Sequence, residues 1–551
     1  MRNRVPFHAA LAASLLFLMV LAAHAAGTQA KAAPTATPEA TATKPVAGFP
    51  PDATTEGLVT VEGRPIHYKA IAGTILVGST DAQDAAFGTG EDAAQKLDDK
   101  DAPATARMSY VAYFQRDTQP ETRPITFLYN GGPGSSTVWL HMGAWGPRRV
   151  VTADDQHTAP APYQLVNNDY SLLDASDLVF VDAPGTGFGR LYGKDKEKAF
   201  WGVDEDGQAF SRFIVRFLSK YHRWNSPKYL FGESYGTTRS AVVANILETH
   251  DNIDLNGVIL LSQILSFDDN ADSPQANPGD ELPYELALPS YTATAYYQHR
   301  LPNQPTDLQP LLTEVEHFAL GDYATALAQG SKLSDENRQR TAGKLHDYTG
   351  LPVSYILKAN LRLNVGMFAH NLQGDRDITT GRLDSRFSGP SMDPLSKEAE
   401  YDPQSAAISS AYVAAFNDYV RSVLQFGEGL TFQPESEEIG DKWNMKHKLP
   451  GAPDAELESN VNVMPDLAAA MKYNPRLKVL LNSGYYDLAT PFFAALYELD
   501  HLPIPQELNA NIQTKFYDSG HMVYAHLPAL KQMHDNVAAF IQGTYTPIKP
   551  Q

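Results

Sequence analysis

Residues 228–236 read Lys-Tyr-Leu-Phe-Gly-Glu-Ser-Tyr-Gly, and residues 237–247 have the composition of a helix. The apolar start predicts a strand, and the glycines of the Gly-x-Ser-x-Gly pattern permit a sharp turn from that strand into the helix. Such a turn exposes the hydroxyl of Ser234 at the carboxyl edge of a sheet, near a helix N-terminus. A pattern this short also arises by chance, so its meaning depends on residues elsewhere in the chain.

A serine hydroxyl is a weak nucleophile until a base removes its proton, so a histidine and a carboxylate must accompany Ser234. Asp487 follows the predicted strand 477–481 and His521 follows the predicted strand 513–517, each after a glycine turn. Taken singly, Asp487 is as readily a loop cap, and His521 a packed loop histidine. Their order after Ser234, each behind a strand, instead favours a triad of Ser234, Asp487 and His521.

A glycine-rich loop follows the predicted strand 125–129. Its residues, 130–136, read Asn-Gly-Gly-Pro-Gly-Ser-Ser. An acyl-transfer site needs backbone N–H groups aimed at the developing oxyanion, each worth about 3 kcal/mol. One such donor is expected in this loop and the other on the residue after the nucleophile, here Tyr235. A plain tight turn is the alternative interpretation of the glycines.

The rest of the sequence alternates short apolar runs with helical patterns, which is typical of a sheet covered by helices on both faces. The helix after Asp204 and the last helix, 527–541, each carry a hydrophobic stripe. Between 266 and 459 the strand patterns lapse into longer helical segments. We therefore expect an α/β-hydrolase fold, with a mixed, mostly parallel sheet flanked by helices and an inserted, largely helical cap. The expected division is signal peptide 1–25, disordered linker 26–57, first core part 58–265, cap 266–459 and second core part 460–545.

The N-terminus has the pattern of an export signal. Arg2 and Arg4 precede an apolar run over residues 9–23, and Ala-His-Ala at 23–25 is similar to a cleavage site. The run is shorter than the roughly 20 apolar residues of a membrane-spanning helix. We therefore expect a cleaved signal, no membrane span in the remaining chain, and an exported protein that is periplasmic or extracellular.

Composition excludes several classes of function. Among 551 residues, 64 are acidic and 44 basic, a formal charge of −20 that repels phosphate backbones, so nucleic acid is not expected as a partner. The absence of cysteine excludes disulfides, thiolate metal sites and cysteine nucleophiles. The glycine cluster 184–189 lacks the Lys-Ser/Thr of a phosphate loop, and the acidic stretch 268–272 lacks the glycine and glutamate of a calcium loop. We expect no cofactor and no metal.

Four motifs together resemble the serine carboxypeptidase family in order and setting. They are Asn-Gly-Gly-Pro-Gly-Ser-Ser at 130–136, Asp-Ala-Pro-Gly-Thr-Gly-Phe at 182–188, Gly-Glu-Ser-Tyr-Gly at 232–236 and Gly-His-Met-Val at 520–523. The resemblance spans residues 109–541 and is weakest across the cap, which suggests a bacterial branch. It implies a secreted serine-type carboxypeptidase that releases C-terminal residues from peptide substrates through an acyl-enzyme.

The resemblance also implies a role for individual residues. The implied triad is Ser234, Asp487 and His521, and the implied oxyanion hole consists of the N–H groups of Gly132 and Tyr235.

A second set of residues is implied to bind the substrate. The set for the C-terminal carboxylate is Asn130, Gly131 and Glu233, and Met522 is a candidate pocket wall. Because two adjacent anions repel, Glu233 is expected to be protonated when it faces that carboxylate, and free C-termini should bind better below neutral pH.

The sequence departs from the family pattern at two positions. Ala144 stands where relatives carry a second glutamate, and Ser135 replaces the cysteine of the glycine loop. Because fold and triad do not fix the substrate, an esterase, an acyltransferase or another peptidase of the same fold stays open as an alternative. A catalytically inactive binding protein is a further alternative from a different class.

Overall fold

The computed structural model describes residues 49–87, 99–451 and 461–545. The elements below belong to the unit that covers residues 52–551. The predicted signal peptide and residues 26–48 of the predicted linker lie outside the described residues. None of the described helices combines the length and the apolar composition that a membrane crossing requires.

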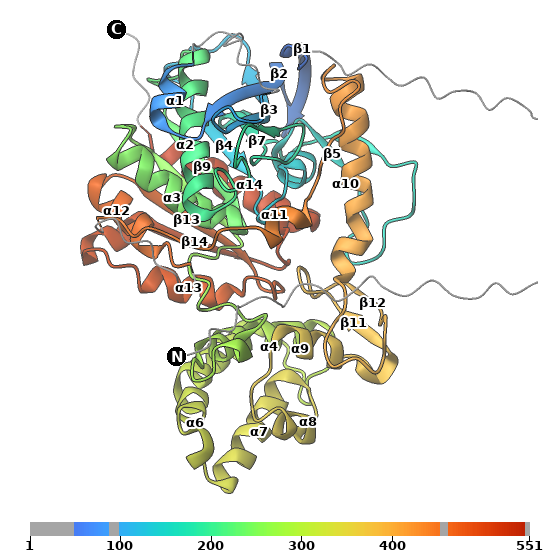
Figure 1. The fold of residues 1–551 in the computed structure, drawn as a ribbon. Coiled ribbons are helices and arrows are strands. Elements are labelled where there is room, and N and C mark those ends of the chain that lie inside the picture. Colours follow the sequence, from blue (N-terminus) through green and yellow to red (C-terminus); the bar gives the residue numbers. More distant parts are fainter. Residues whose placement is uncertain (1–48, 88–98, 452–460, 546–551) are drawn as a thin grey trace, which may run out of the picture. The chain divides into compact units, whose positions relative to one another are not determined.

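A sheet of ten strands forms the centre of the described part of residues 52–551 (Figure 1). Its order is β1 (Ala53–Val61), β2 (Arg64–Gly78), β3 (Thr105–Gln115), β7 (Asp177–Val181), β4 (Ile125–Tyr129), β9 (Lys228–Glu233), β10 (Gly257–Leu261), β13 (Lys478–Gly484) and β14 (Ile512–Tyr517), with β8 (Arg190–Tyr192) beside β3. Neighbours from β1 to β7 are antiparallel, and all neighbours from β7 to β14 are parallel. The sheet is therefore mixed and mostly parallel, as predicted.

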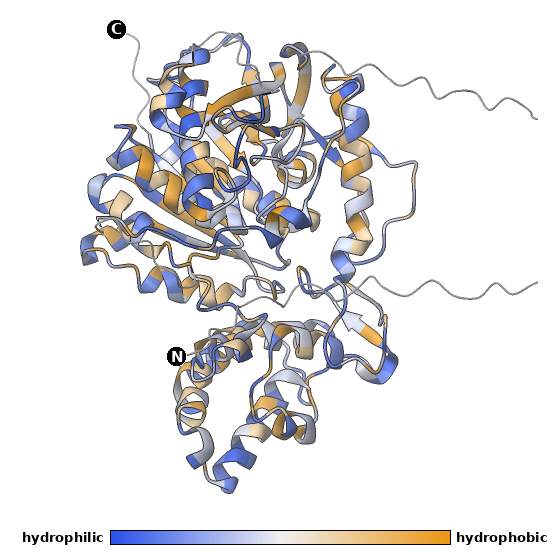
Figure 2. Ribbon diagram, viewed as in Figure 1, coloured by the Kyte–Doolittle hydropathy of each residue, from blue (hydrophilic) through white to orange (hydrophobic). Residues whose placement is uncertain are grey.

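Helices cover both faces of this sheet (Figure 1). One face packs against α2 (Val203–Lys220), α3 (Tyr235–Thr249), α12 (Met464–Tyr473) and α13 (Phe492–Asp500). The other packs against α14 (Leu527–Gly543), the π-helix η1 (Leu140–Trp145) and α10 (Pro403–Ser422). Figure 2 shows hydrophobic and hydrophilic residues on the same covering helices, as amphipathic helices require. The α/β-hydrolase fold predicted from the sequence is confirmed.

The chain between β10 and β13 holds most of the other helices. A hydrophobic core of their own joins α4 (Leu282–Tyr297), α5 (Leu308–Phe318), α6 (Ala324–Ala328), α7 (Asp335–Thr349), α8 (Val353–Lys358) and α9 (Val365–Asn371). Figure 1 shows this group beside one edge of the sheet region. The same insertion contains β11 (Ile378–Thr380), β12 (Ser388–Pro390), α10 and α11 (Glu437–Asp441). The remaining α-helix and strands of the described residues are α1 (Asp81–Ala85), β5 (Arg148–Val150) and β6 (Leu165–Asn167).

The predicted end of the linker at residue 57 is wrong. β1 begins at Ala53 and pairs antiparallel with β2 along its whole length, from Ala53 opposite Ala72 to Val61 opposite Arg64. β1 is an edge strand whose first six residues alternate between partly buried and exposed. Such a strand can carry threonines and a glutamate, as a linker does. The pairing with β2, rather than local composition, orders this segment.

A fully buried ion pair joins the helices on one face to the glycine-rich loop. Nε of Arg239, on α3, lies 2.6 Å from Oδ2 of Asp206, on α2, and neither side chain is accessible to solvent. Nη1 of Arg239 also donates to the carbonyl oxygen of Asn130 at 2.7 Å. One guanidinium therefore fixes two helices and the start of the loop after β4.

Arg239→Ala is expected to lower the free energy of unfolding by about 3–5 kcal/mol, because it leaves the Asp206 carboxylate buried without a partner. Urea denaturation followed by circular dichroism measures this loss. Arg116→Ala, which breaks the exposed pair with Glu56, serves as the control and should cost less than about 1 kcal/mol. Equal losses for the two variants would contradict the importance of the buried pair.

Candidate active site

The turn at Ser234 joins β9 directly to α3. Ser234 has φ +60° and ψ −131°, a backbone conformation that non-glycine residues adopt only under constraint. A Cβ on Gly232 would lie 2.1 Å from the carbonyl oxygen of Gly236, and a Cβ on Gly236 would lie 2.8 Å from that of Tyr129. Both glycines of the pattern are therefore required by close packing. The N–H of Ser234 donates to the carbonyl oxygen of Leu261 at 3.0 Å, which ties the turn to the end of β10.

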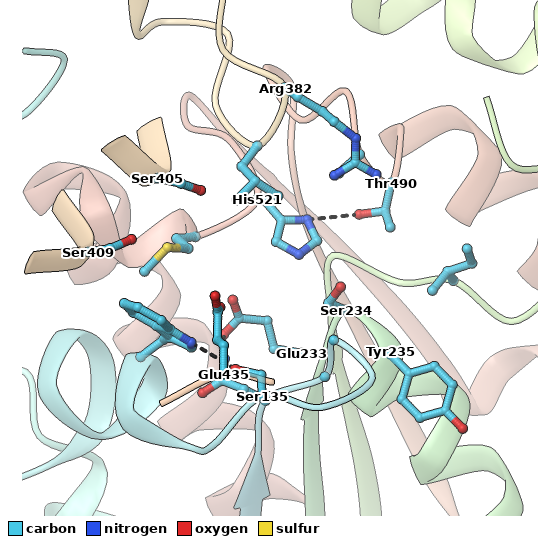
Figure 3. Close-up of a pocket in the computed structure, with 18 of the residues that line it drawn as sticks. Ser135, Glu233, Ser234, Tyr235, Arg382, Ser405, Ser409, Glu435, Thr490 and His521 are labelled. Atoms are coloured by element: carbon cyan, nitrogen blue, oxygen red, sulfur yellow. Dashed lines mark hydrogen bonds between the residues drawn. The ribbon is translucent and has the colours of Figure 1, made fainter. Parts of the chain in front are cut away.

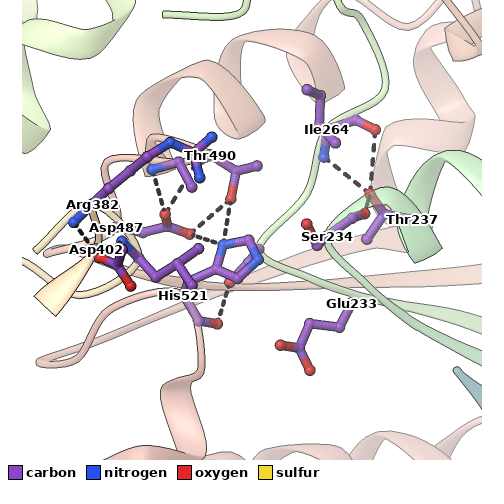
Figure 4. Close-up of polar contacts among 12 residues, drawn as sticks. Glu233, Ser234, Thr237, Ile264, Arg382, Asp402, Asp487, Thr490 and His521 are labelled. Carbon is purple, nitrogen blue, oxygen red and sulfur yellow. Dashed lines mark hydrogen bonds and ion pairs between the residues drawn. The ribbon is translucent and has the colours of Figure 1, made fainter. Parts of the chain in front are cut away.

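Asp487 and His521 follow β13 and β14 and meet at the carboxyl edge of the sheet (Figure 4). Oδ2 of Asp487 lies 2.8 Å from Nδ1 of His521. Oδ1 accepts the N–H groups of Ala489 and Thr490 at 2.8 and 3.0 Å, and the Thr490 hydroxyl donates to Oδ2 at 2.7 Å. These donors orient the buried carboxylate, which in turn orients the imidazole.

Ser234 and His521 line one cavity, although no hydrogen bond joins their side chains in the described chain (Figure 4). Within the described residues, Nε2 of His521 has no hydrogen-bond partner, so it is free to accept a proton on the cavity side. Hydrogen bonds of catalytic groups are often long in empty sites and shorten only when substrate binds. The separation is therefore compatible with a nucleophile and its base.

Opposing influences act on the pKa of His521. Burial lowers it, whereas the charge of Asp487 and its hydrogen bond raise it, and Glu233 raises it further. The net result is a pKa above the ordinary value of histidine. The charged neighbours therefore outweigh burial and stabilise the imidazolium that forms when His521 takes a proton.

Glu233 is buried and is held by two donors. Nδ2 of Asn130 donates to Oε2 at 2.8 Å, and the hydroxyl of Tyr524 donates to the same oxygen at 2.9 Å. Oδ1 of Asn130 accepts the N–H of Leu140 at 3.0 Å, which fixes the orientation of the amide. Burial raises the pKa of Glu233 to about 7, against the smaller lowering effects of His521, Tyr524 and Asn130. This carboxyl group therefore changes protonation near neutral pH.

The glycine-rich loop lies directly against the turn at Ser234. A Cβ on Gly131 would lie 2.4 Å from the amide nitrogen of Tyr235, so only glycine permits this approach. The N–H groups of Gly132 and Tyr235 make no hydrogen bond to another described residue, and both residues line the cavity that contains Ser234. Two unpaired backbone donors beside a serine hydroxyl are what an oxyanion hole requires.

The cavity has a volume of about 240 Å³ (Figure 3). The predicted site residues that line it are Asn130, Gly131, Gly132, Glu233, Ser234, Tyr235, His521 and Met522. Asp487 is not part of the lining and contacts His521 from behind. Ala144, at the position of the absent second glutamate, is buried in η1 and does not line the cavity.

Sequence reasoning missed the residues that the insertion contributes. They are Phe267, Asn270, Arg382, Leu383, Ser405, Ser409 and Glu435. The carbonyl oxygen of Leu383 accepts the N–H of His521 at 2.6 Å, so the insertion also supports the histidine. Tyr524 and Thr490 were missed as well, and the only signal for them was their position three residues after His521 and Asp487.

Comparison with known proteins relates part of this chain to a protein family. Residues 99–359 match the family model described as serine carboxypeptidase. This region belongs to the serine carboxypeptidase family. The resemblance predicted from the four motifs is thereby confirmed. The match includes the loop after β4 and the turn at Ser234 but ends before β13, so the assignment of Asp487 and His521 depends on geometry.

Individual serine carboxypeptidase relatives are similar over short stretches. Serine carboxypeptidase-like 44 of Arabidopsis thaliana is 26% identical over 181 residues, 30% of this chain and 35% of the relative. Pheromone-processing carboxypeptidase KEX1 of Phytophthora infestans is 29% identical over 136 residues, 22% of this chain and 20% of the relative. The chain thus matches about a third or less of the length of these relatives. The solved peroxisomal alpha-beta-hydrolase Lpx1 of Saccharomyces cerevisiae is 9% identical, with a TM-score of 0.35 over 88% of this chain and 92% of that chain.

Asp487→Asn is expected to move the pKa of His521 below the ordinary value of histidine. Burial lowers this pKa and the Asp487 anion opposes that effect, so removal of the anion leaves burial dominant. NMR titration of the His521 imidazole measures the shift. Asp518→Asn, an exposed change three residues before His521, is the control and should leave the pKa in place. A pKa of His521 that is the same in Asp487→Asn and in the unaltered protein would contradict the coupling.

Proposed function

We propose that this protein is a serine-type carboxypeptidase that releases C-terminal residues from peptides through an acyl-enzyme. The observation that carries the proposal is the buried cluster of Asn130, Glu233 and Tyr524, of which Asn130 and Glu233 line the cavity that also contains Ser234 and His521. An enzyme that binds the free C-terminal carboxylate of a peptide needs hydrogen-bonding groups for that carboxylate, whereas a general serine hydrolase does not. Membership of the matched region in the serine carboxypeptidase family supports the same conclusion.

The proposed reaction uses Ser234 as nucleophile. As Oγ of Ser234 bonds to the carbonyl carbon of the last peptide bond, its proton passes to Nε2 of His521, and Asp487 holds Nδ1 of the same ring. The N–H groups of Gly132 and Tyr235 stabilise the oxyanion. His521 then gives the proton to the amine nitrogen as the C–N bond breaks. Water, deprotonated by His521, attacks the acyl-enzyme; the bond from the carbonyl carbon to Oγ of Ser234 breaks, the proton passes from His521 back to Oγ, and the shortened peptide is released.

The C-terminal carboxylate is proposed to bind at Asn130, Gly131 and Glu233. Protonated Glu233 donates a hydrogen bond to that carboxylate, whereas ionised Glu233 repels it. The raised pKa of Glu233, about 7, makes the donor form available at neutral and mildly acidic pH. Ala144 supplies no second carboxyl group, so Glu233 must perform this role without it.

Several further statements belong to the same proposal. We infer that the protein is exported, as the N-terminal pattern predicts, and that residues 266–459 act as a cap that bounds the substrate cavity. Support for the cap is the contribution of Arg382, Ser409 and Glu435 to the cavity lining. Met522 is proposed as a pocket wall on the same grounds.

Ser234→Ala is expected to lower the release of C-terminal residues by at least about 10⁴-fold, because no other group replaces the attacking oxygen. Mass spectrometry of a shortening peptide measures release, and a fluorophosphonate probe should label the unaltered protein at Ser234 only. Ser240→Ala, in the following helix, is the control and should retain labelling. Undiminished release by Ser234→Ala would refute the assignment of the nucleophile, and absence of labelling in folded protein would favour an inactive binding protein.

The affinity for a peptide with a free C-terminus is expected to fall as the pH rises through about 7, because Glu233 then loses the proton that it donates. Titration of peptide into Ser234→Ala protein between pH 5 and 9 measures affinity without turnover. In a Glu233→Gln background the fall should disappear, because the amide donates at every pH. A fall of the same size and midpoint in both backgrounds would contradict the role of Glu233.

A further inference from the structure

The outer side of β1 has backbone groups without a partner. At one end of the strand the side chain of Asn167 caps Thr60: it accepts the N–H at 2.9 Å and donates to the carbonyl oxygen at 2.7 Å. Backbone groups of an antiparallel strand alternate between its two sides, so those of Glu56 and Leu58 point outward like those of Thr60. No described residue bonds to them. The edge of the sheet is therefore open to another strand from Glu56 to Leu58.

A cavity of about 360 Å³ lies along this open edge, beside the C-terminal end of α10 (Figure 1). Four successive residues of β1, from Thr55 to Leu58, line it. Because successive side chains point to opposite faces of a sheet, a cavity lined by all four reaches the edge of the strand itself. The ring of Tyr68, on β2, packs against Gly57, where a Cβ would lie 2.4 Å from Cζ of the tyrosine.

This edge cavity is separate from the catalytic cavity. α10 contributes Ser405, near its N-terminus, to the catalytic cavity and Val423, directly after its last residue, to the edge cavity. The two positions are about 25 Å apart along the helix. The two cavities share no lining residue.

Arg148, on β5, places a cation on the wall of the edge cavity. Among the described residues its guanidinium has no hydrogen-bond partner and no ion-pair partner, and the residue is partly buried. Burial raises the pKa of Tyr68 and of Tyr419, and the positive charge of Arg148 opposes that rise in both. The guanidinium therefore lies near two tyrosine side chains. A partly buried guanidinium without an acidic partner favours the binding of a carboxylate.

A strand added antiparallel to β1 would bring a side chain to this cation. Paired residues of neighbouring strands share a face, so a residue opposite Gly57 directs its side chain to the face that carries Tyr68. Residues two positions away on the added strand point to the same face. Leu165 and Val423 line the edge cavity with exposed apolar surface. The edge thus fits an extended segment in which apolar side chains flank an acidic one.

We propose that β1 binds an extended segment of a partner polypeptide as an additional antiparallel strand, with an acidic side chain of that segment on Arg148. Complementary charge supports this partner, because Arg148 lacks a carboxylate. A second copy of the chain is less suitable, because each copy has a formal charge of −20. The inference does not depend on the proposed function, since it concerns a separate cavity.

The probe is acetyl-Val-Thr-Glu-Thr-Val-amide, titrated into the unaltered protein by calorimetry. Its valines and its glutamate share one face of a strand, and both its ends are blocked, so it lacks the free carboxylate that the proposed carboxypeptidase site requires. An analogue with lysine in place of glutamate should bind at least about tenfold more weakly, because it brings a second cation to Arg148.

Two variants test the two parts of the proposed contact. Arg148→Gln should weaken the binding of the acidic peptide by about tenfold, the effect of a hydrogen bond between charged groups. Arg64→Gln removes an equal charge from an exposed pair with Glu62, outside the edge cavity, and should change the affinity by less than about twofold. Leu58→Pro removes an outward N–H without loss of a bond to β2 and should abolish binding.

Methylated peptides test strand addition without a change to the protein, and so decide the matter even if Leu58→Pro fails to fold. With the glutamate opposite Gly57, the N–H groups of the two threonines face β1 and that of the glutamate faces away. Methylation of the threonine nitrogens should abolish binding, whereas methylation of the glutamate nitrogen should preserve it. Equal affinity of the two methylated peptides would overturn strand addition.

Three further results would overturn the inference. The first is no binding of the acidic peptide at about 1 mM. The second is an affinity that neither Arg148→Gln nor the lysine analogue lowers. The third is a dimer of the unaltered protein, detected by sedimentation, that Leu58→Pro dissociates, because the edge would then belong to a second copy of the chain.

Discussion

The backbone conformation of Ser234, with φ +60°, is the constraint on which the site depends. Glycines at 232 and 236 leave room for it, and Gly131 of a different loop presses against the amide of Tyr235. The turn is therefore held by contacts that come from β4, β9, β10 and α3 at once. Strain of this kind persists only where the surroundings determine the conformation from several sides.

The same turn explains why a carboxyl-binding group and a nucleophile can share one cavity. Glu233 precedes Ser234 directly, and both side chains line the cavity (Figure 3). Asn130 and Tyr524 hold the carboxyl group of Glu233. Glu233 raises the pKa of His521, and His521 lowers the pKa of Glu233. The proposed reaction needs a neutral His521 and a protonated Glu233, so the two groups must be treated as a coupled pair whose pH dependence belongs to both.

Local sequence patterns predicted the parts of the fold that local forces determine. The strand 125–129 was predicted with the bounds that β4 has, and the turn at Ser234 was evident from its glycines. Asp487 and His521 were predicted from chain order, and the structure brings their side chains to 2.8 Å, although their roles stay a prediction. The β1 strand was missed because an exposed edge strand has a polar composition.

The residues that the insertion contributes could not be predicted in the same way. Glu435 reaches the cavity through pairing with residues about 300 positions earlier in the sequence, and no pattern near residue 435 indicates that partner. Leu383 supports His521 through a backbone contact, which leaves no requirement for a particular side chain. Contacts of this type are decided by the packing of the whole insertion.

Selective action on free carboxyl ends is the central claim, and one pair of peptides tests it most directly. The two peptides have the same sequence and differ only in a free or an amidated C-terminus, and the release of the last residue is followed at pH 6. The account predicts release from the free acid and at least a tenfold lower kcat/KM for the amide, because the amide cannot accept hydrogen bonds as a carboxylate does. Equal kcat/KM for the two peptides would contradict the account.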